Sequence, residues 1–135
     1  MNLRPFRIVR QLVLPACLTL SLQAAPVATV AAEEAVAADP KHYTVEFEND
    51  RVRVLRIKYG PHEKSVMHDH PANVAVFLTD IQSKFTLPDG STADASRKAG
   101  TVEWDAGGTH LPENVGDQPF ELILVELKGD AAPAK

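Results

Sequence analysis

The sequence has little of three things: cysteine, basic charge and long apolar segments. Cys17 is the only cysteine among 135 residues, and it lies in an N-terminal segment that we expect to be removed. The mature domain would then hold no thiol. This excludes disulfides, catalysis by a thiolate and zinc held by cysteines.

The charge balance argues against nucleic acid as a partner. The full chain carries 14 Lys and Arg against 18 Asp and Glu, a net charge of −4. Residues 1–32 contain three arginines and no acid, so their removal leaves 11 basic and 18 acidic residues, a net charge of −7. An acidic surface repels phosphate backbones, and we expect no binding to nucleic acid.

No segment is long and apolar enough to predict a membrane span. The best candidate, residues 12–20, is short and is interrupted by Pro15, whereas a spanning helix needs about 20 apolar residues. This run instead follows a basic start and precedes small residues, which is the order of a secretory signal peptide. We therefore expect residues 1–32 to be a signal peptide and the mature protein to be periplasmic or secreted.

The cleavage site is less well defined than the segment. Small residues favour cleavage after Ala32, with Ala25 and Ala28 as close competitors. Leu14-Pro15-Ala16-Cys17 loosely resembles a lipobox, so lipidation of Cys17 stays open. Residues 33–40 lack a hydrophobic period and end at Pro40, which predicts a linker. The folded domain is expected at 41–128, and residues 129–135 are expected to be a flexible tail.

The domain sequence alternates in the manner of β-strands rather than helices. Strands are predicted near 44–48, 51–59, 74–78, 101–104 and 120–128, with Gly and Pro punctuation between them. A phase shift at Leu55 suggests a β-bulge within 51–59. The unbroken apolar run 74–78 is typical of a strand buried on both faces. With the shorter segments between these ranges, we expect about eight short strands in all, which predicts an all-β sandwich or barrel. Its modest core would gain from a homodimer formed through an edge strand or the N-terminal segment.

Histidines mark the candidate site. His68 and His70 are two residues apart, so on a strand both imidazoles lie on one face, where they could bind zinc, iron, manganese, nickel or copper. A glycine-rich turn leads to His110, a possible third ligand 40 residues further on. Trp104 and Phe77 are expected in the core, and Asn114 is expected to orient His110 or cap a turn.

The two segments resemble the paired motifs of the cupin superfamily. Gly60, His68 and His70 match the first motif, and the second is matched by four residues: Gly100, Gly107, His110 and Asn114. The resemblance covers nearly all of residues 47–128 and implies a cupin-type double-stranded β-helix, a jelly-roll barrel. It also implies a divalent metal ion held by His68, His70 and His110, and a small-molecule ligand in the barrel lumen.

One departure from the motif affects the function. The family's glutamate ligand would fall near Val74 or Ala75, neither of which can bind metal, so three imidazoles and no carboxylate would leave open positions on the ion. An Fe(II)-type dioxygenase or another small-molecule metalloenzyme fits such a site. A non-catalytic binding module and a metal-free structural homodimer are the alternatives. No catalytic residue is assigned, although Glu63 and Glu113 are the acids near the motifs that could face the mouth.

Overall fold

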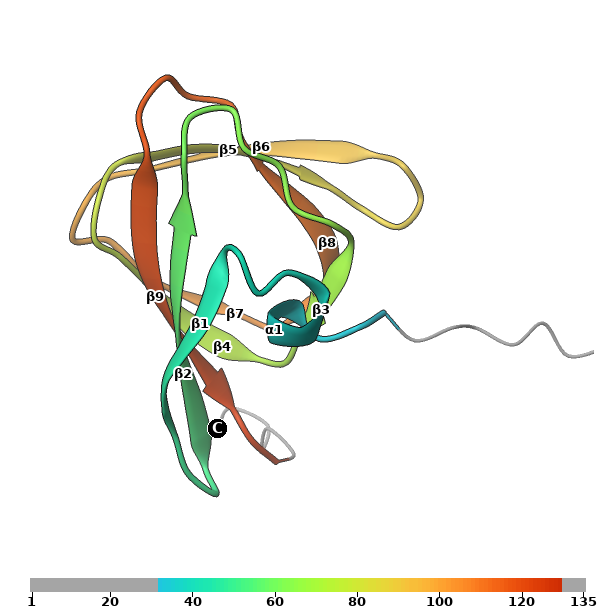
Figure 1. The fold of residues 1–135 in the computed structure, drawn as a ribbon, viewed down its shortest axis with the longest axis vertical. Helices are drawn as coiled ribbons and strands as arrows, with labels where there is room; N and C mark the ends of the chain where they lie inside the picture. Colours follow the sequence, from blue (N-terminus) through green and yellow to red (C-terminus); the bar gives the residue numbers. More distant parts are fainter. Residues whose placement is uncertain (1–31, 130–135) are drawn as a thin grey trace, which may run out of the picture.

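The computed structural model describes residues 32–129, and most of these form two antiparallel sheets (Figure 1). The predicted signal peptide and most of the predicted tail therefore lie outside the described residues. The elements in chain order are α1 (Ala35–Ala38), β1 (Tyr43–Glu48), β2 (Val52–Tyr59), β3 (His68–His70), β4 (Asn73–Phe77), β5 (Ile81–Thr86), β6 (Thr92–Arg97), β7 (Val102–Asp105), β8 (Gly108–Asn114) and β9 (Phe120–Leu127).

The strand order is that of a jelly roll. One sheet has the order β1-β2-β9-β4-β7 and the other β3-β8-β5-β6, so strands distant in sequence become neighbours. The prediction of an all-β double-stranded β-helix is confirmed. The only helix among the described residues is the single turn α1, and none in that part of the chain is long and apolar enough to cross a membrane.

The core follows from strict alternation on the two central strands of the larger sheet. On β9, Phe120, Leu122 and Leu124 are buried, while the residues between them are half-buried on the outer face. On β2, Leu55 and Ile57 point inward in the same way. Each fully buried side chain of this size contributes about 1.5–3 kcal/mol, so these inner faces hold the two sheets together.

The predicted bulge is on the wrong strand. β2 pairs with β9 without interruption from Val52 to Tyr59, and the register shift lies in β1, between Val45 and Phe47. The phase shift in the sequence has another cause. Val54, before the shift, is an apolar residue on the outer face, whereas Leu55, after it, is on the inner face.

Two further burial predictions need correction for the same reason. Only one face of β4 is buried, that of Asn73, Ala75 and Phe77, and the other is half-buried. Phe77 is in the core as expected, but Trp104 is 59% exposed because β7 is the edge strand of its sheet. The apolar character of β4 and β7 thus extends to the outside of the barrel.

Residues 33–40 are packed against the barrel, so the prediction of a linker there is wrong. The side chain of Glu34 caps the helical turn α1, and Ala35 is fully buried. The amide of Asp69 donates to the carbonyl of Glu33 at 2.9 Å, which ties this segment to the strand that carries the histidine pair. A small residue such as Ala35 packs closely without creating a hydrophobic period, which is why the sequence pattern missed it.

Candidate metal centre

Strand pairing brings the three predicted histidines together. β3 carries His68 and His70, both buried and on the same face. β3 pairs with β8 in a register that sets His68 directly opposite His110. One nitrogen of each ring lies within 4.8 Å of one nitrogen of each of the others. The structure thus confirms the convergence that the resemblance implied, and the three come from only two neighbouring strands.

Hydrogen bonds fix which nitrogen of each paired histidine faces the centre. His68 Nδ1 donates to the Val66 carbonyl at 2.8 Å, and His70 Nδ1 donates to Glu126 Oε1 at 2.6 Å. Because each Nδ1 has an acceptor, each Nε2 is the nitrogen left to face the centre, and the two Nε2 atoms lie 3.1 Å apart. When both rings are neutral, the lone pairs of the two Nε2 atoms repel each other at this distance unless a cation lies between them.

The electrostatic environment favours a metal ion over a proton as that cation. Burial, together with the neighbouring His70 and His68, lowers the pKa of His110 to about 4. Burial and the charge of His70 also lower the pKa of His68. At neutral pH these two rings are uncharged, the form that binds divalent metals. The donor set therefore fits a transition-metal ion such as zinc or iron.

A buried carboxylate on β9, which sequence reasoning overlooked, lies behind His70. Glu126 is 1% exposed and contacts His70, while its second oxygen accepts from Arg53 Nε at 2.6 Å. Burial would raise the pKa of Glu126, but His70 and Arg53 outweigh it and keep the group ionised. A carboxylate behind a histidine ligand fixes the ring and raises its basicity, so Glu126 is suited to support the site from behind.

A signal for Glu126 is present in the sequence. The inward positions of the last strand are Phe120, Leu122, Leu124 and Glu126, and only the final one is charged. A single carboxylate on an otherwise apolar inward face requires a buried partner.

Two motif residues have structural roles around the site. A Cβ on Gly107 would lie 2.5 Å from the carbonyl oxygen of His70, and its φ of +85° is in the region that favours glycine. Asn114 is buried and donates to the carbonyls of Gly60 and Gln118, so it anchors the loop before β3 and caps a turn. The expectation that Asn114 could orient His110 is not supported by any of these bonds.

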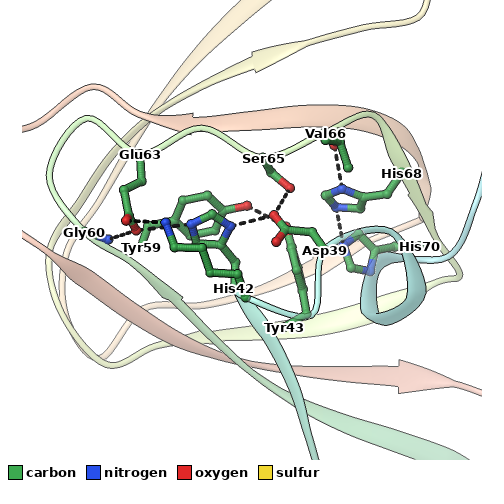
Figure 2. Close-up of polar contacts among 11 residues, drawn as sticks. Asp39, His42, Tyr43, Tyr59, Gly60, Glu63, Ser65, Val66, His68 and His70 are labelled. Carbon is green, nitrogen blue, oxygen red and sulfur yellow. Dashed lines mark hydrogen bonds and ion pairs between the residues drawn. The ribbon is translucent and has the colours of Figure 1, made fainter.

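Another buried histidine, His42, lies beside the site, and the sequence had given no reason to select it. His42 Nδ1 lies 2.5 Å from Asp39 Oδ2, and its Nε2 lies 3.1 Å from Glu63 Oε2. Its ring stacks on Tyr59 at 4.1 Å between centroids. Figure 2 shows His42 between these two carboxylates, with Ser65 donating to Asp39 from the other side. Both ring nitrogens are therefore occupied by protein groups.

The other sequence candidates do not line the lumen. Glu63 binds Lys41, His42 and the amide of Gly60, contacts that lower its pKa to about 2. Glu113 faces Lys64 at 3.5 Å between the charged atoms. His62 is exposed and pairs with Asp117 at 2.8 Å. The suggestion that Glu63 or Glu113 could act at the mouth is therefore wrong.

The lumen itself is a cavity of about 340 Å³. His70 and His110 line it at one side, and most of its wall is apolar. At its rim Arg97 Nε donates to Glu103 Oε1 at 2.5 Å, which joins β6 to β7 where the two sheets have no backbone pairing. The principal apolar lining residues are Ile57, Phe77, Ile81, Phe85, Phe120, Leu122 and Leu124.

Fold and site together define a double-stranded β-helix with a histidine cluster in its lumen, and solved structures agree. A cupin domain from Bordetella pertussis superposes with a TM-score of 0.60 at 25% identity, covering 64% of this chain and 92% of that one. An uncharacterized double-stranded β-helix protein from Klebsiella pneumoniae has a TM-score of 0.53 at 22% identity, covering 67% and 78%. No protein-family model matches the chain, and neither does any curated protein.

An RmlC-like cupin family protein from Methanocaldococcus jannaschii extends this likeness. Its TM-score is 0.51 at 17% identity, over 65% of this chain and 82% of that one. The chain is a small member of the cupin superfamily.

Proposed function

We propose that this protein is an exported cupin that binds one divalent metal ion through His68, His70 and His110. The observation that carries the proposal is the convergence of one nitrogen from each of the three rings within 4.8 Å, with the Nε2 atoms of His68 and His70 turned to the centre by acceptors on Nδ1. Three nitrogen ligands favour iron, zinc, manganese, nickel or copper over calcium or magnesium.

The ligand that shares the lumen is a small, neutral and largely apolar molecule. The cavity is at the lower end of the size range of ligand pockets. Among the described residues that line it, Arg97 is the only cation, and Glu103 already pairs with it. The lining gives a carboxylate or phosphate no free cation of the protein, and it offers few hydrogen bonds to a sugar.

Chemistry at this site would depend on the metal. A divalent ion with open positions can polarise a bound molecule as a Lewis acid, and iron(II) can also activate oxygen. Among the described lining residues each acid has a partner, since Glu103 binds Arg97 and Asp105 accepts from the amide of Gly107. That arrangement supplies no free general base, which keeps a non-catalytic binding module as the second candidate function.

Metal analysis followed by titration tests the proposal. Protein purified from its native compartment should hold close to one transition-metal ion per chain, and metal-free protein should bind it again with the same stoichiometry. A metal-free native protein that binds zinc, manganese, iron(II), nickel and copper(II) only weakly would refute metal binding. Turnover of small neutral substrates by the loaded protein then separates an enzyme from a binding module.

Export is tested separately by the intact mass of the secreted protein. Removal of residues 1–32 from the chain is expected, because these residues have the order of a signal peptide. A mature chain that still begins at Met1 would contradict export.

A further inference from the structure

Aromatic side chains gather around the lumen. The part of the chain that the structure describes contains seven Phe, Tyr and Trp residues, and six of them line the cavity. These six are Tyr43, Tyr59, Phe77, Phe85, Trp104 and Phe120. Phe47, the seventh, lies outside the cavity on β1 and is 54% exposed. Phe85 lies edge-on to His110 with ring centroids 5.1 Å apart, so the aromatic wall reaches the candidate metal centre.

The cavity reaches the surface between β6 and β7. These two strands are the edge strands of their sheets and share no backbone pairing. A side chain that lines a cavity and is also exposed marks the place where the cavity meets solvent. Among the described residues, all the exposed members of the lining are on β7 or on the hairpin of β5 and β6: Leu87, Ala93, Trp104 and Asp105. Trp104 is the largest of them and is 59% exposed, so it stands at the opening.

The inward residues of β6 leave this opening free. They are Ala93, Ala95 and Arg97, and the single methyl group of each alanine fills little of the space between the sheets. Arg97 binds Glu103 next to the loop that connects β6 to β7, with 2.5 Å between the charged atoms. This contact joins the two strands near the loop. The opening therefore lies further along β6, beside the alanines.

We propose that the lumen binds a neutral aromatic molecule of one or two rings, which enters between β6 and β7 and contacts Trp104 at the opening. This ligand class rests on the proposed function, because it specifies the molecule that shares the lumen with the metal ion. The volume of the cavity sets the size of the ligand. A cavity of about 150 Å³ holds benzene, so the 340 Å³ of this lumen corresponds to about two rings.

The lining favours an aromatic ligand over a saturated one of the same size. Two rings in a stacked or edge-to-face arrangement improve affinity by roughly two- to tenfold beyond the effect of the buried area. A ligand in this cavity has such partners on both sheets, Phe85 on the smaller sheet and Phe77 and Phe120 on the larger one. A fatty acid is disfavoured, because Arg97 is already paired with Glu103.

Fluorescence of Trp104, the only tryptophan of the chain, tests the class of ligand. 1-Naphthylamine is a neutral molecule of two rings whose absorption overlaps the emission of tryptophan. One molecule should bind per chain of the purified protein and receive energy from Trp104. Benzyl alcohol should then displace it at a concentration about threefold or more below that of cyclohexylmethanol, its saturated counterpart. Equal displacement by the two alcohols, or stronger displacement by cyclohexylmethanol, would overturn the aromatic class.

Two matched pairs of variants test the position of the ligand. Ala95→Phe fills the space beside the opening and should weaken binding of 1-naphthylamine about tenfold or more, whereas Ser96→Phe, on the outward face of β6, should leave binding unchanged. Trp104→Ser should weaken binding about threefold or more. Phe47→Ser removes an exposed ring outside the cavity and should have no effect. Direct excitation of 1-naphthylamine measures all four variants, because Trp104→Ser lacks the energy donor.

Metal titration of the same proteins separates the ligand class from the metal site. All four variants should bind metal with the wild-type stoichiometry, which also shows that they are folded, because none of the changed residues is a predicted metal ligand. A wild type that binds metal but not 1-naphthylamine would overturn the ligand class and leave the metal site intact. Equal binding of 1-naphthylamine by wild type, Ala95→Phe and Trp104→Ser would overturn it as well. The predicted pattern in a protein that binds no metal would support the entrance and refute the metal site.

Discussion

His42 and the pair of His68 and His70 are all buried in this barrel, and they differ in how many of their ring nitrogens have a protein partner. His42 has a carboxylate on each ring nitrogen, from Asp39 and Glu63. His68 and His70 have an acceptor on Nδ1 only, and their Nε2 atoms face each other (Figure 2). The difference teaches that burial alone does not make a ligand. A histidine binds metal when its neighbours occupy one nitrogen and leave the other free.

The largest expected difference is in metal affinity, between a variant that lacks His110 and one that lacks His42. His110→Ala should weaken metal affinity about 100- to 1,000-fold, because three protein ligands leave no substitute for a lost one. His42→Ala should change affinity less than about threefold, since both nitrogens of His42 bind protein groups. Isothermal titration of metal-free protein measures both, and equal losses in the two variants would contradict the distinction.

Removing His42 should have a large effect on the stability of the protein, in contrast to its small effect on metal affinity. His42→Ala leaves Asp39 buried with Ser65 as its remaining side-chain partner, so the free energy of unfolding of the metal-free protein should fall by about 2–4 kcal/mol. His62→Ala is the matched control. The His62 side chain is 63% exposed and its pair with Asp117 is at the surface, so a change under about 0.5 kcal/mol is expected. Urea unfolding would contradict the account if both variants were equally stable.

Acid should destabilise the metal-free protein over a defined pH range. The pKa of His110 is lowered from 6.5 to about 4, so below pH 6.5 the unfolded chain takes up a proton that the folded chain does not. Stability should fall by on the order of 3 kcal/mol between pH 6.5 and 4. His68 acts in the same direction. Thermal unfolding of wild type and His110→Asn checks this, and an equally steep decline in the variant would exclude His110 as the cause.

A smaller effect should come from the residue behind His70. Glu126→Gln keeps an acceptor for Nδ1 but removes its charge, and metal affinity should fall about 10- to 100-fold. Glu121→Gln is the matched control, because Glu121 is on the same strand but faces outward to Arg56. If both variants bound metal like wild type, Glu126 would be a purely structural partner of Arg53.

Local patterns in the sequence predict the strands, the shared face of His68 and His70, and the extent of the barrel. They do not predict Glu126, which meets His70 only after β9 pairs with β4. Long-range pairing of this kind leaves one local trace, a charge at an inward position. His42 gives no such trace, because its partners lie in the segment expected to be a linker and in a loop.

The errors in the predicted fold share one origin. The phase shift at Leu55 predicts a bulge. The unbroken run 74–78 predicts a strand buried on both faces, and the apolar Trp104 predicts a core position. All three arise because the larger sheet is apolar on its outer face as well as its inner one. An exposed apolar face and a core use the same residues, so a pattern of apolar positions alone does not separate them.

X-ray absorption at the edge of the bound metal tests the central claim most directly. It counts the imidazoles on the ion in the wild-type protein and in His42→Ala. We predict three imidazole nitrogens in both proteins, at about 2.0–2.2 Å from the ion. Two or fewer imidazoles in wild type, or the loss of one in His42→Ala, would contradict the assignment of His68, His70 and His110 as the metal ligands.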